Sequence, residues 1–555
     1  MTETVLPGVY IEVRPEALIV PGAVTVGNVG VVGTASKGPV GTPQLLGSFA
    51  DALARFGPYD RYDPEAPGDE LTLVRALELA YRFGASTVHA VRVADAGNAA
   101  AAHTLESPTG DCVELRALSP GTWGNELTVA VGTADANAVV RDEEVGGTPP
   151  QLAHAPVIPS AVNRIVVRPG AGGPDRVLPI VYDPAAPGDV GPTQIGVTTA
   201  DGSLTLGTAL GAGDTLRAAY TVDSSEARKV TVKLGVSAEE AYTVVSGDDL
   251  VADLAATPSA LVTGVAGTSS AELPDAVGAT PLTGGADGAA GADYATGLGA
   301  LLGVDAHLVV AAGQGPGFGD ELATHVEVAS NNENKRDRIA VVGTDPATTP
   351  EGFVQAASNH PLNSDRVVLV GPGIRAADRS QSPPLTVTLP GAYAAAAVAG
   401  MLSANPPHVS LTNKVLAVDG LEHVLSSAQL KQLVLSRVLA LESRQGVRVV
   451  RGITTSTNTA WTQITTRRIV DFTKLGVRSA ATPYIGLLNN ERVRGALRAS
   501  INGFLNEMVL GELLTSYELN VSATRDDEIR GIARVDMTIR PTFSIDFIKV
   551  TIFLE

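Results

Sequence analysis

The chain has 555 residues, of which 44% are hydrophobic, enough for the cores of about two to four domains. Its 59 acidic and 40 basic residues give a net charge of -19, which argues against non-specific nucleic-acid binding and against docking on an anionic membrane. The single cysteine, Cys112, excludes an internal disulfide framework and a cysteine-rich zinc site, and we expect it to be a small core residue.

The N-terminal stretch predicts a short strand. The apolar residues Val9, Ile11 and Val13 alternate with Tyr10 and two charged residues after a Pro-Gly break. No basic and then apolar export signal precedes this stretch, and no run of about eighteen uncharged apolar residues occurs in the sequence. We therefore expect a protein that is made and folded in the cytoplasm.

Two separate blocks of the sequence predict one α/β body. Residues 71–93 combine an amphipathic helix, a stop at Gly84 and a strand from Thr87 to Val93. Continuous apolar runs at residues 304–313, 337–344 and 365–373 are typical of buried parallel strands, with room for helices between them. We predict an open, mostly parallel α/β domain formed by residues 21–100 and 285–425.

The segment between these blocks has a different character. Gly, Pro, Ala and Asp accumulate in residues 101–284 around short alternating runs, at 126–132, 163–169, 215–222 and 228–235. Such a pattern is typical of hairpins and loops rather than βαβ units. We interpret residues 101–284 as a β-rich insertion that splits the α/β domain, protrudes from it and tolerates change.

Residues 426–540 predict a separate α+β core. Apolar spacing indicates one helix from about Ala428 to Glu442 and a second from about Asn490 to Leu510. Alternating runs at residues 515–524 and 533–541 then predict an antiparallel pair.

The polar face of the second helix carries three arginines, Arg492, Arg494 and Arg498. A helix face of this kind is either solvated or a docking surface.

Residues 541–555 predict a strand with no obvious partner. Ile548, Val550, Ile552 and Leu554 share one face, and the alternation changes phase between Phe547 and Ile548. A bulge would produce this change, and so would a chain that leaves one sheet to join another. An unpaired apolar strand is an aggregation hazard, so we expect it to pair with a neighbouring copy. Such a head-to-tail contact need not close, which allows helical arrays.

The sequence offers no chemistry of an enzyme. The eight histidines are scattered without metal-ligand spacing, and no GxSxG motif occurs. Glycine-rich stretches at residues 27–33, 297–303 and 313–319 do not match GxGxxG or the phosphate loop. The third follows a strand and precedes a helix, where amides could bind an anion, but a tight βα loop needs those glycines anyway and it lacks the lysine. We expect no catalytic residue, metal or cofactor.

Several stretches carry a family resemblance. They are PGVYIEV (7–13), GVVGTASKGPVGTP (30–43), LTGGADG (282–288) and a C-terminal block that runs from RGITTSTNTAW at residue 451 to the end. In their order and their placement at both ends, these stretches make the chain resemble the tail sheath proteins of contractile phage tails and of phage-tail-like injection systems.

The resemblance implies a structural role without nucleotide hydrolysis. Sheath subunits stack as rings or helical strands around an inner tube, and their N-terminal and C-terminal arms, here residues 1–20 and 541–555, interlock with neighbours. The sheath shortens on triggering and drives the tube through a target envelope. The implied partners are other copies, the tube protein, and baseplate and terminal cap proteins. Residues 426–540 would lie nearest the tube, with Arg492, Arg494 and Arg498 as candidate contacts.

Two other functions are compatible with parts of the sequence. A nucleotide-binding or hydrolytic α/β enzyme requires a complete phosphate loop or catalytic set. A static self-assembling coat or surface-layer protein also needs interlocking termini, but it would have no second, contracted form.

Overall fold

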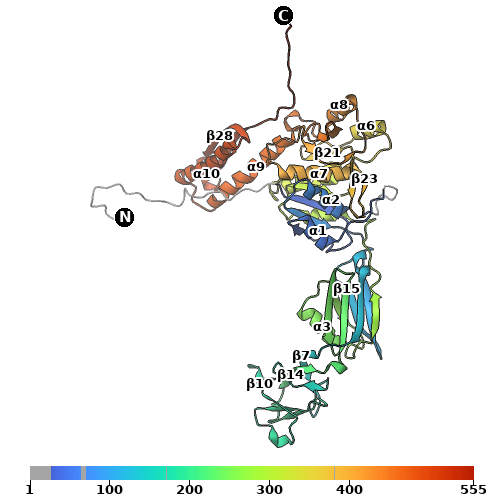
Figure 1. Ribbon diagram of the computed structural model, residues 1–555. Helices are drawn as coiled ribbons and strands as arrows, with labels where there is room; N and C mark the ends of the chain where they lie inside the picture. Colours follow the sequence, from blue (N-terminus) through green and yellow to red (C-terminus); the bar gives the residue numbers. More distant parts are fainter. Residues whose placement is uncertain (1–26, 64–69, 171, 381, 555) are drawn as a thin grey trace, which may run out of the picture. The chain divides into compact units, whose positions relative to one another are not determined.

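The computed structural model describes residues 27–63, 70–170, 172–380 and 382–554, and the chain divides into two compact units (Figure 1). One unit contains the described residues up to Ala35, residues 40–94 and the chain from residue 289 onward. The other contains residues 36–39 and 95–288. The predicted arm at residues 1–20, including Val9, Tyr10, Ile11 and Val13, lies outside the described residues.

A nine-stranded sheet forms the centre of the first unit. Its central strands run parallel and its outer strands antiparallel, as in an open α/β sheet. The strands at residues 308–311, 339–343 and 367–371 are those predicted from the apolar runs. In sheet order the strands are β2 (Gln44–Leu46), β3 (Val88–Arg92), β1 (Val29–Gly33), β19 (Leu308–Ala311), β20 (Ile339–Gly343), β21 (Val367–Gly371), β26 (Leu439–Ser443), β27 (Val447–Val449) and β24 (Val415–Leu416).

Helices cover both faces of this sheet, which explains why its central strands β1, β19, β20 and β21 are apolar throughout. Val31 and Val310 point into one core, whereas Val32 and Val309 point into the other. The first core is closed by α1 (Phe49–Phe56), α2 (Thr72–Arg82) and α7 (Gly391–Ala404), and the second by α4 (Tyr294–Leu301), α5 (Gly319–Ser330), α6 (Pro350–Ser358) and α8 (Ser427–Leu435).

Helices α2 and α7 pack closely because α7 consists mainly of small residues (Figure 1). A Cβ atom on Gly400 would lie 2.3 Å from the carbonyl oxygen of Ala80, so a larger residue at position 400 would push the helices apart. A small sheet lies beside these helices and consists of β23 (Leu385–Leu389), β22 (Ile374–Asp378) and β25 (Gly420–Leu421).

The second unit is rich in strands, as the sequence predicts for the insertion, and it has two hydrophobic cores. Cys112 lies fully buried in the first core. That core is built from β4 (Ala102–Ser107), β5 (Gly110–Ala117), β6 (Leu127–Thr133), β15 (Arg228–Leu234), β16 (Ala238–Val244), α3 (Gly247–Ala256), β17 (Val262–Ala266) and β18 (Val277–Pro281). The other core is built from β7 (Ala138–Val145), β8 (Val157–Ile158), β9 (Arg164–Arg168), β10 (Arg176–Leu178), β11 (Ile180–Tyr182), β12 (Ile195–Val197), β13 (Leu204–Leu206) and β14 (Thr215–Val222).

The C-terminal elements form a small α+β group with its own core. Helix α9 (Ile464–Ala481) packs on α10 (Glu491–Leu510), and α10 packs on strand β28 (Leu514–Ser522), which pairs antiparallel with β29 (Arg534–Pro541). The short helix α11 (Arg525–Ile529) connects the two strands. The second predicted helix and the hairpin are therefore present.

The structure differs from the sequence prediction at the start of this core. The predicted helix 428–442 ends as α8 at Leu435, and the chain turns at Arg437, whose φ angle is 68°, into strand β26. Strand β26 joins β21 in parallel, so residues 426–449 complete the α/β sheet instead of opening a separate domain. A short apolar run such as Val438–Leu441 fits a buried strand as well as a helix, and the pattern alone does not distinguish them.

Candidate assembly surfaces

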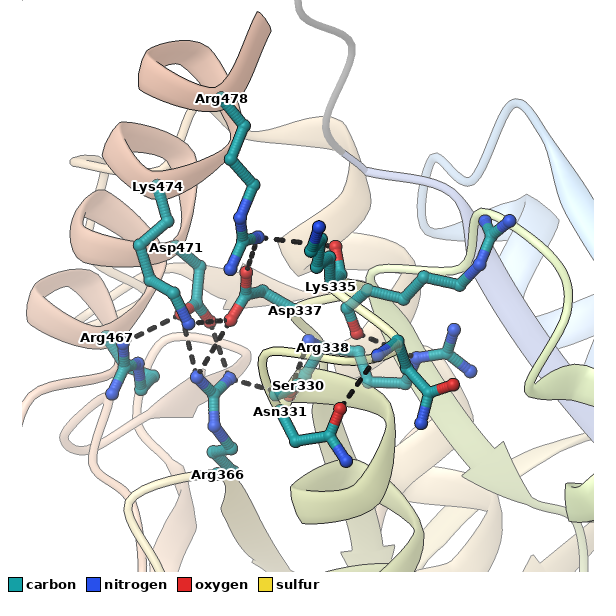
Figure 2. A network of polar contacts seen from close by, with 12 residues as sticks. Ser330, Asn331, Lys335, Asp337, Arg338, Arg366, Arg467, Asp471, Lys474 and Arg478 are labelled. Atoms are coloured by element: carbon teal, nitrogen blue, oxygen red, sulfur yellow. Dashed lines mark hydrogen bonds and ion pairs between the residues drawn. The ribbon is translucent and has the colours of Figure 1, made fainter. Parts of the chain in front are cut away.

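Helix α9 binds the α/β body through charged side chains on one helical face (Figure 2). Arg467, Asp471, Lys474 and Arg478 recur at the spacing of successive helical turns, so they share that face. They meet residues that lie just before strands β20 and β21. We call this group the α9 ion-pair cluster; it consists of Asp337, Arg366, Arg467, Asp471, Lys474 and Arg478.

Arg366 and Asp337 are the buried centre of the α9 ion-pair cluster. Arg366 makes a two-point contact with Asp471, in which Nη1 lies 2.8 Å from Oδ2 and Nη2 lies 2.9 Å from Oδ1. Its Nη2 also lies 3.2 Å from Oδ1 of Asp337. Asp337 in turn accepts hydrogen bonds from Lys474 and from Arg478, the latter at 2.5 Å.

The surrounding charges keep both central groups ionised despite their burial. Burial opposes the charge on Asp337, but the hydrogen bonds from Lys474 and Arg478 outweigh it and lower the pKa of that carboxyl. Burial likewise disfavours the charge on Arg366, but the neighbouring Asp471 outweighs it and raises the pKa of the guanidinium. Separation of α9 from the body would leave buried charges unpaired, which is strongly unfavourable. The cluster therefore holds α9 to the body.

The C-terminal group packs tightly around a glycine. A Cβ atom on Gly476 of α9 would lie 1.9 Å from the ring of Phe504 on α10, and that ring lies 5.8 Å from the ring of Phe472, centre to centre. Beyond α10, strands β28 and β29 pair only with each other among the described strands. Each therefore presents an open edge to which a further strand can add.

The three arginines predicted as tube contacts have different environments. Arg494 is half-buried and contacts Glu528 at 3.0 Å, so it serves the internal packing of the C-terminal group. Arg492 and Arg498 lie on the exposed surface of α10. Further along the same face, the hydroxyl of Tyr517 lies 2.6 Å from the amide oxygen of Asn502, which ties α10 to the hairpin.

After β29 the chain lies against the same molecule, and the usual orientation of its polar and apolar side chains is inverted. Polar residues such as Ser544 and Asp546 are half-buried, whereas Phe543, Ile545 and Phe547 are 62%, 81% and 75% exposed. An extended segment normally turns its apolar residues inward. Here the apolar face is presented outward.

Asp546 fixes this segment to the α/β body. Its side chain is 7% exposed and accepts hydrogen bonds from Arg451 Nε at 2.9 Å, Thr412 Oγ1 at 3.2 Å and Gln463 Nε2 at 3.3 Å. The guanidinium of Arg451 also lies over the ring of Phe547, 5.5 Å from its centre. We call these five residues the Asp546 clamp.

Beyond the clamp, residues 548–554 form no strand, and they have no partner in the described part of the chain. Ile548, Val550, Ile552 and Leu554 are 82%, 76%, 79% and 95% exposed, and Phe553 is 86% exposed. Residues 548–554 join none of the ladders formed by the described strands.

The glycine-rich loop at residues 313–319 borders a cavity of about 870 Å³ at the carboxyl ends of the parallel strands. Its lining includes the carboxylates of Glu70, Glu321, Asp345 and Glu422 and contains no lysine or arginine. Burial raises the pKa values of Glu70 and Asp345. An acidic lining without lysine or arginine does not suit a phosphate.

Among the described residues, no group of three or more His, Cys, Asp or Glu side chains is placed to hold a metal ion. No helix in the described ranges combines the length and the apolar character needed to cross a membrane.

The family comparisons agree with this arrangement of elements. Residues 287–455 match the phage tail sheath protein central domain, and residues 456–555 match the phage tail sheath C-terminal domain. Residues 287–555 are thus identified as the central and C-terminal domains of a phage tail sheath protein. The boundary between the two sheath domains falls just before α9, which agrees with the assignment of α8 and β26 to the α/β body.

Solved sheath proteins share the fold at low sequence identity. A sheath tail protein from Desulfitobacterium hafniense has a TM-score of 0.57 and 14% identity, over 96% of this chain and all of that one. A sheath tail protein from Listeria innocua has a TM-score of 0.59 and 15% identity, over 95% of each chain. A search of curated proteins found no match.

Sequence reasoning missed the two groups that position the C-terminal elements. The helical spacing of the charges between Arg467 and Arg478 was a usable signal for α9. The partners of those charges could not be predicted in this way, because Asp337 and Arg366 lie about a hundred residues or more away in the sequence. The Asp546 clamp likewise joins side chains that only the fold brings together.

Proposed function

We propose that the protein is the sheath subunit of a contractile particle, and that it polymerises as a helical or stacked-ring sheath around an inner tube. The observation that carries the proposal is the apolar segment 548–554, which is exposed and unpaired in a chain with both sheath domains. A monomer that left this segment uncovered would aggregate. A second copy of the chain provides the ordered alternative.

The acceptor for this segment is an open edge of the β28–β29 hairpin in a neighbouring copy. A strand that adds to this edge gains backbone hydrogen bonds worth about 0.5 to 1.5 kcal/mol each. Burial of Ile548, Val550, Ile552 and Leu554 contributes up to about 1.5 to 3 kcal/mol per side chain. The N-terminal arm, with Val9, Tyr10, Ile11 and Val13, supplies a further strand to the same intersubunit sheet.

Contraction then requires a rigid subunit with flexible connections. The α9 ion-pair cluster supports the rigid part, because it holds the C-terminal group to the α/β body through buried charges. The arms supply the connections, so the bodies rotate while the mesh of strands stays intact. The movement drives the tube through a target envelope, and no nucleotide is consumed.

The remaining surfaces are assigned from the same arrangement. Arg492 and Arg498 on α10 are the proposed tube contacts, whereas Arg494 positions the helix through Glu528. Residues 101–284, which lie within the second unit, are the proposed outer insertion. Baseplate and terminal cap proteins bind the ends of the sheath, and the particle is a phage tail or a tail-like device that is assembled in the cytoplasm.

Negative-stain electron microscopy of the full chain expressed alone tests the proposal. We expect hollow, striated tubes, and a second, wider and shorter form when the tubes are exposed to mild denaturant. Tubes of a single, invariant form would support a static coat protein instead. Discrete compact particles at every concentration would contradict the polymerisation.

A further inference from the structure

The base of the C-terminal arm is held by its own subunit, although the rest of the arm is free. Up to Phe547 the chain follows the α/β body and has the Asp546 clamp as its last attachment. Residues 548–554 are all exposed, and their apolar residues are at least 76% exposed. The alternation of apolar residues also changes phase between Phe547 and Ile548, so the sequence pattern breaks where the attachment ends.

The clamp gathers side chains from three separate parts of the subunit. Thr412 lies just before β24, Arg451 follows β27, and Gln463 is the N-terminal cap of α9. One carboxylate therefore ties the arm to the edge of the sheet and to the helix that carries the α9 ion-pair cluster. A carboxylate at the N-terminal end of a helix also interacts favourably with the helix dipole.

The inverted side-chain pattern shows why a polar anchor is used at this place. Because Ser544 and Asp546 face the subunit, Phe543, Ile545 and Phe547 remain outward. An apolar anchor would turn these residues inward and bury the segment in its own subunit. A charged hydrogen-bonded anchor fixes one orientation, since its bonds are directional and are stronger than those between neutral groups.

We propose that Asp546 and Arg451 form the pivot of the C-terminal arm, which keeps residues up to Phe547 on their own subunit and aims residues from Ile548 onward at a second copy of the chain. This proposal rests on the proposed function, since it assumes that the arm is donated. Asp546 is a positioning residue: it acts through the direction that it gives to the arm.

The test compares Asp546→Asn and Arg451→Gln with Asp142→Asn, an exposed carboxylate in the insertion that pairs with Arg217 at 3.4 Å. Limited chymotrypsin digestion is measured on full-length soluble subunits, below the concentration at which tubes form. Both pivot variants are expected to be cut after Phe543 and Phe547 about tenfold faster than the parent, because the clamp closes a local opening. The Asp142 variant is expected to match the parent.

Tube formation supplies the second readout. The concentration needed for tubes is expected to rise about tenfold in each pivot variant, and not in the Asp142 control. A chain that lacks only residues 548–555 is measured in parallel. If that deletion abolishes tubes while both pivot variants assemble like the parent, the pivot is refuted and the donated arm stands.

If the deletion still forms normal tubes, the donated arm itself is refuted. A melting curve for each variant shows whether the subunit is folded. Should one pivot variant fail to fold, the other decides the outcome, because both remove the same contact from opposite sides.

Discussion

Arg366 and Asp471 form a two-point ion pair between the start of strand β21 and helix α9, with nitrogen-to-oxygen distances of 2.8 and 2.9 Å. Their side chains are only 9% and 12% exposed. A pair in this geometry joins the sheet of the central domain to the first helix of the C-terminal group. The pair therefore opposes separation of helix α9 from the central domain.

The joint can be weakened by one substitution. Asp471→Asn leaves Arg366 buried with a weaker partner, so we expect the free energy of unfolding to fall by up to about 3 to 5 kcal/mol. The measurement is chemical denaturation of soluble subunits. The matched control is Asp526→Asn, which breaks an exposed pair with Arg530 and should cost no more than about 1 kcal/mol. Equal losses in both variants would contradict the role of the cluster.

Packing between α9 and α10 gives a second prediction. Gly476→Ala places a Cβ atom against the ring of Phe504, and we expect a loss of about 1 to 3 kcal/mol in the free energy of unfolding. Gly495→Ala on α10 meets open space and should stabilise the helix by up to about 1 kcal/mol. Thermal melting of the two variants would show opposite shifts. A gain in stability for Gly476→Ala would show that the helices are not in close contact.

Acid should destabilise the subunit through buried neutral histidines. His325 accepts a hydrogen bond from Arg338 at 3.1 Å, and burial lowers its pKa from 6.5 to about 4. The unfolded chain therefore binds more protons between pH 6.5 and about 4, so the free energy of unfolding falls as the pH drops through this window. Above pH 6.5 the contribution of His325 is complete.

His325→Gln tests this account because it keeps an acceptor without the titration. We expect it to remove up to about 3 kcal/mol of the pH dependence between pH 6.5 and 4, at about 1.4 kcal/mol per pKa unit. His103→Gln, at a half-exposed position of the insertion, controls for the loss of an imidazole. An unchanged slope in the His325 variant would mean that other groups govern the acid response.

Residues 134–227 of the second unit can be deleted between two paired strands. Thr133 at the end of β6 and Arg228 at the start of β15 are opposed in one antiparallel pair, so a two-residue Asn-Gly turn can replace residues 134–227. We expect a folded subunit that still forms tubes, because the core around Cys112 and the whole first unit are retained. Circular dichroism and electron microscopy would check this. Insoluble protein would show that the deleted part supports the rest.

The sequence predicted elements wherever one pattern dominated. The apolar runs became β19, β20 and β21, and the amphipathic stretch before Gly511 became α10. The prediction failed at Val438–Leu441, because a short apolar run fits a helix and a buried strand equally well. Helix α9 was missed because its face toward the body is charged rather than apolar.

Less of the candidate site than of the fold could be predicted from the sequence. The apolar alternation of residues 548–554 is a local pattern, and the proposed arm was predicted from it alone. The anchors are not local: Asp546 meets Thr412, Arg451 and Gln463 only after the sheet and α9 have formed. A sequence shows which residue types are present, whereas such a clamp depends on which distant residues the fold brings together.

The most direct test of the central claim is electron microscopy of the full chain beside a chain that lacks residues 548–555. We expect tubes from the full chain and soluble, folded monomers from the shortened one, since the donated strand holds the subunits together. Normal tubes from the shortened chain would contradict the claim that this arm builds the sheath.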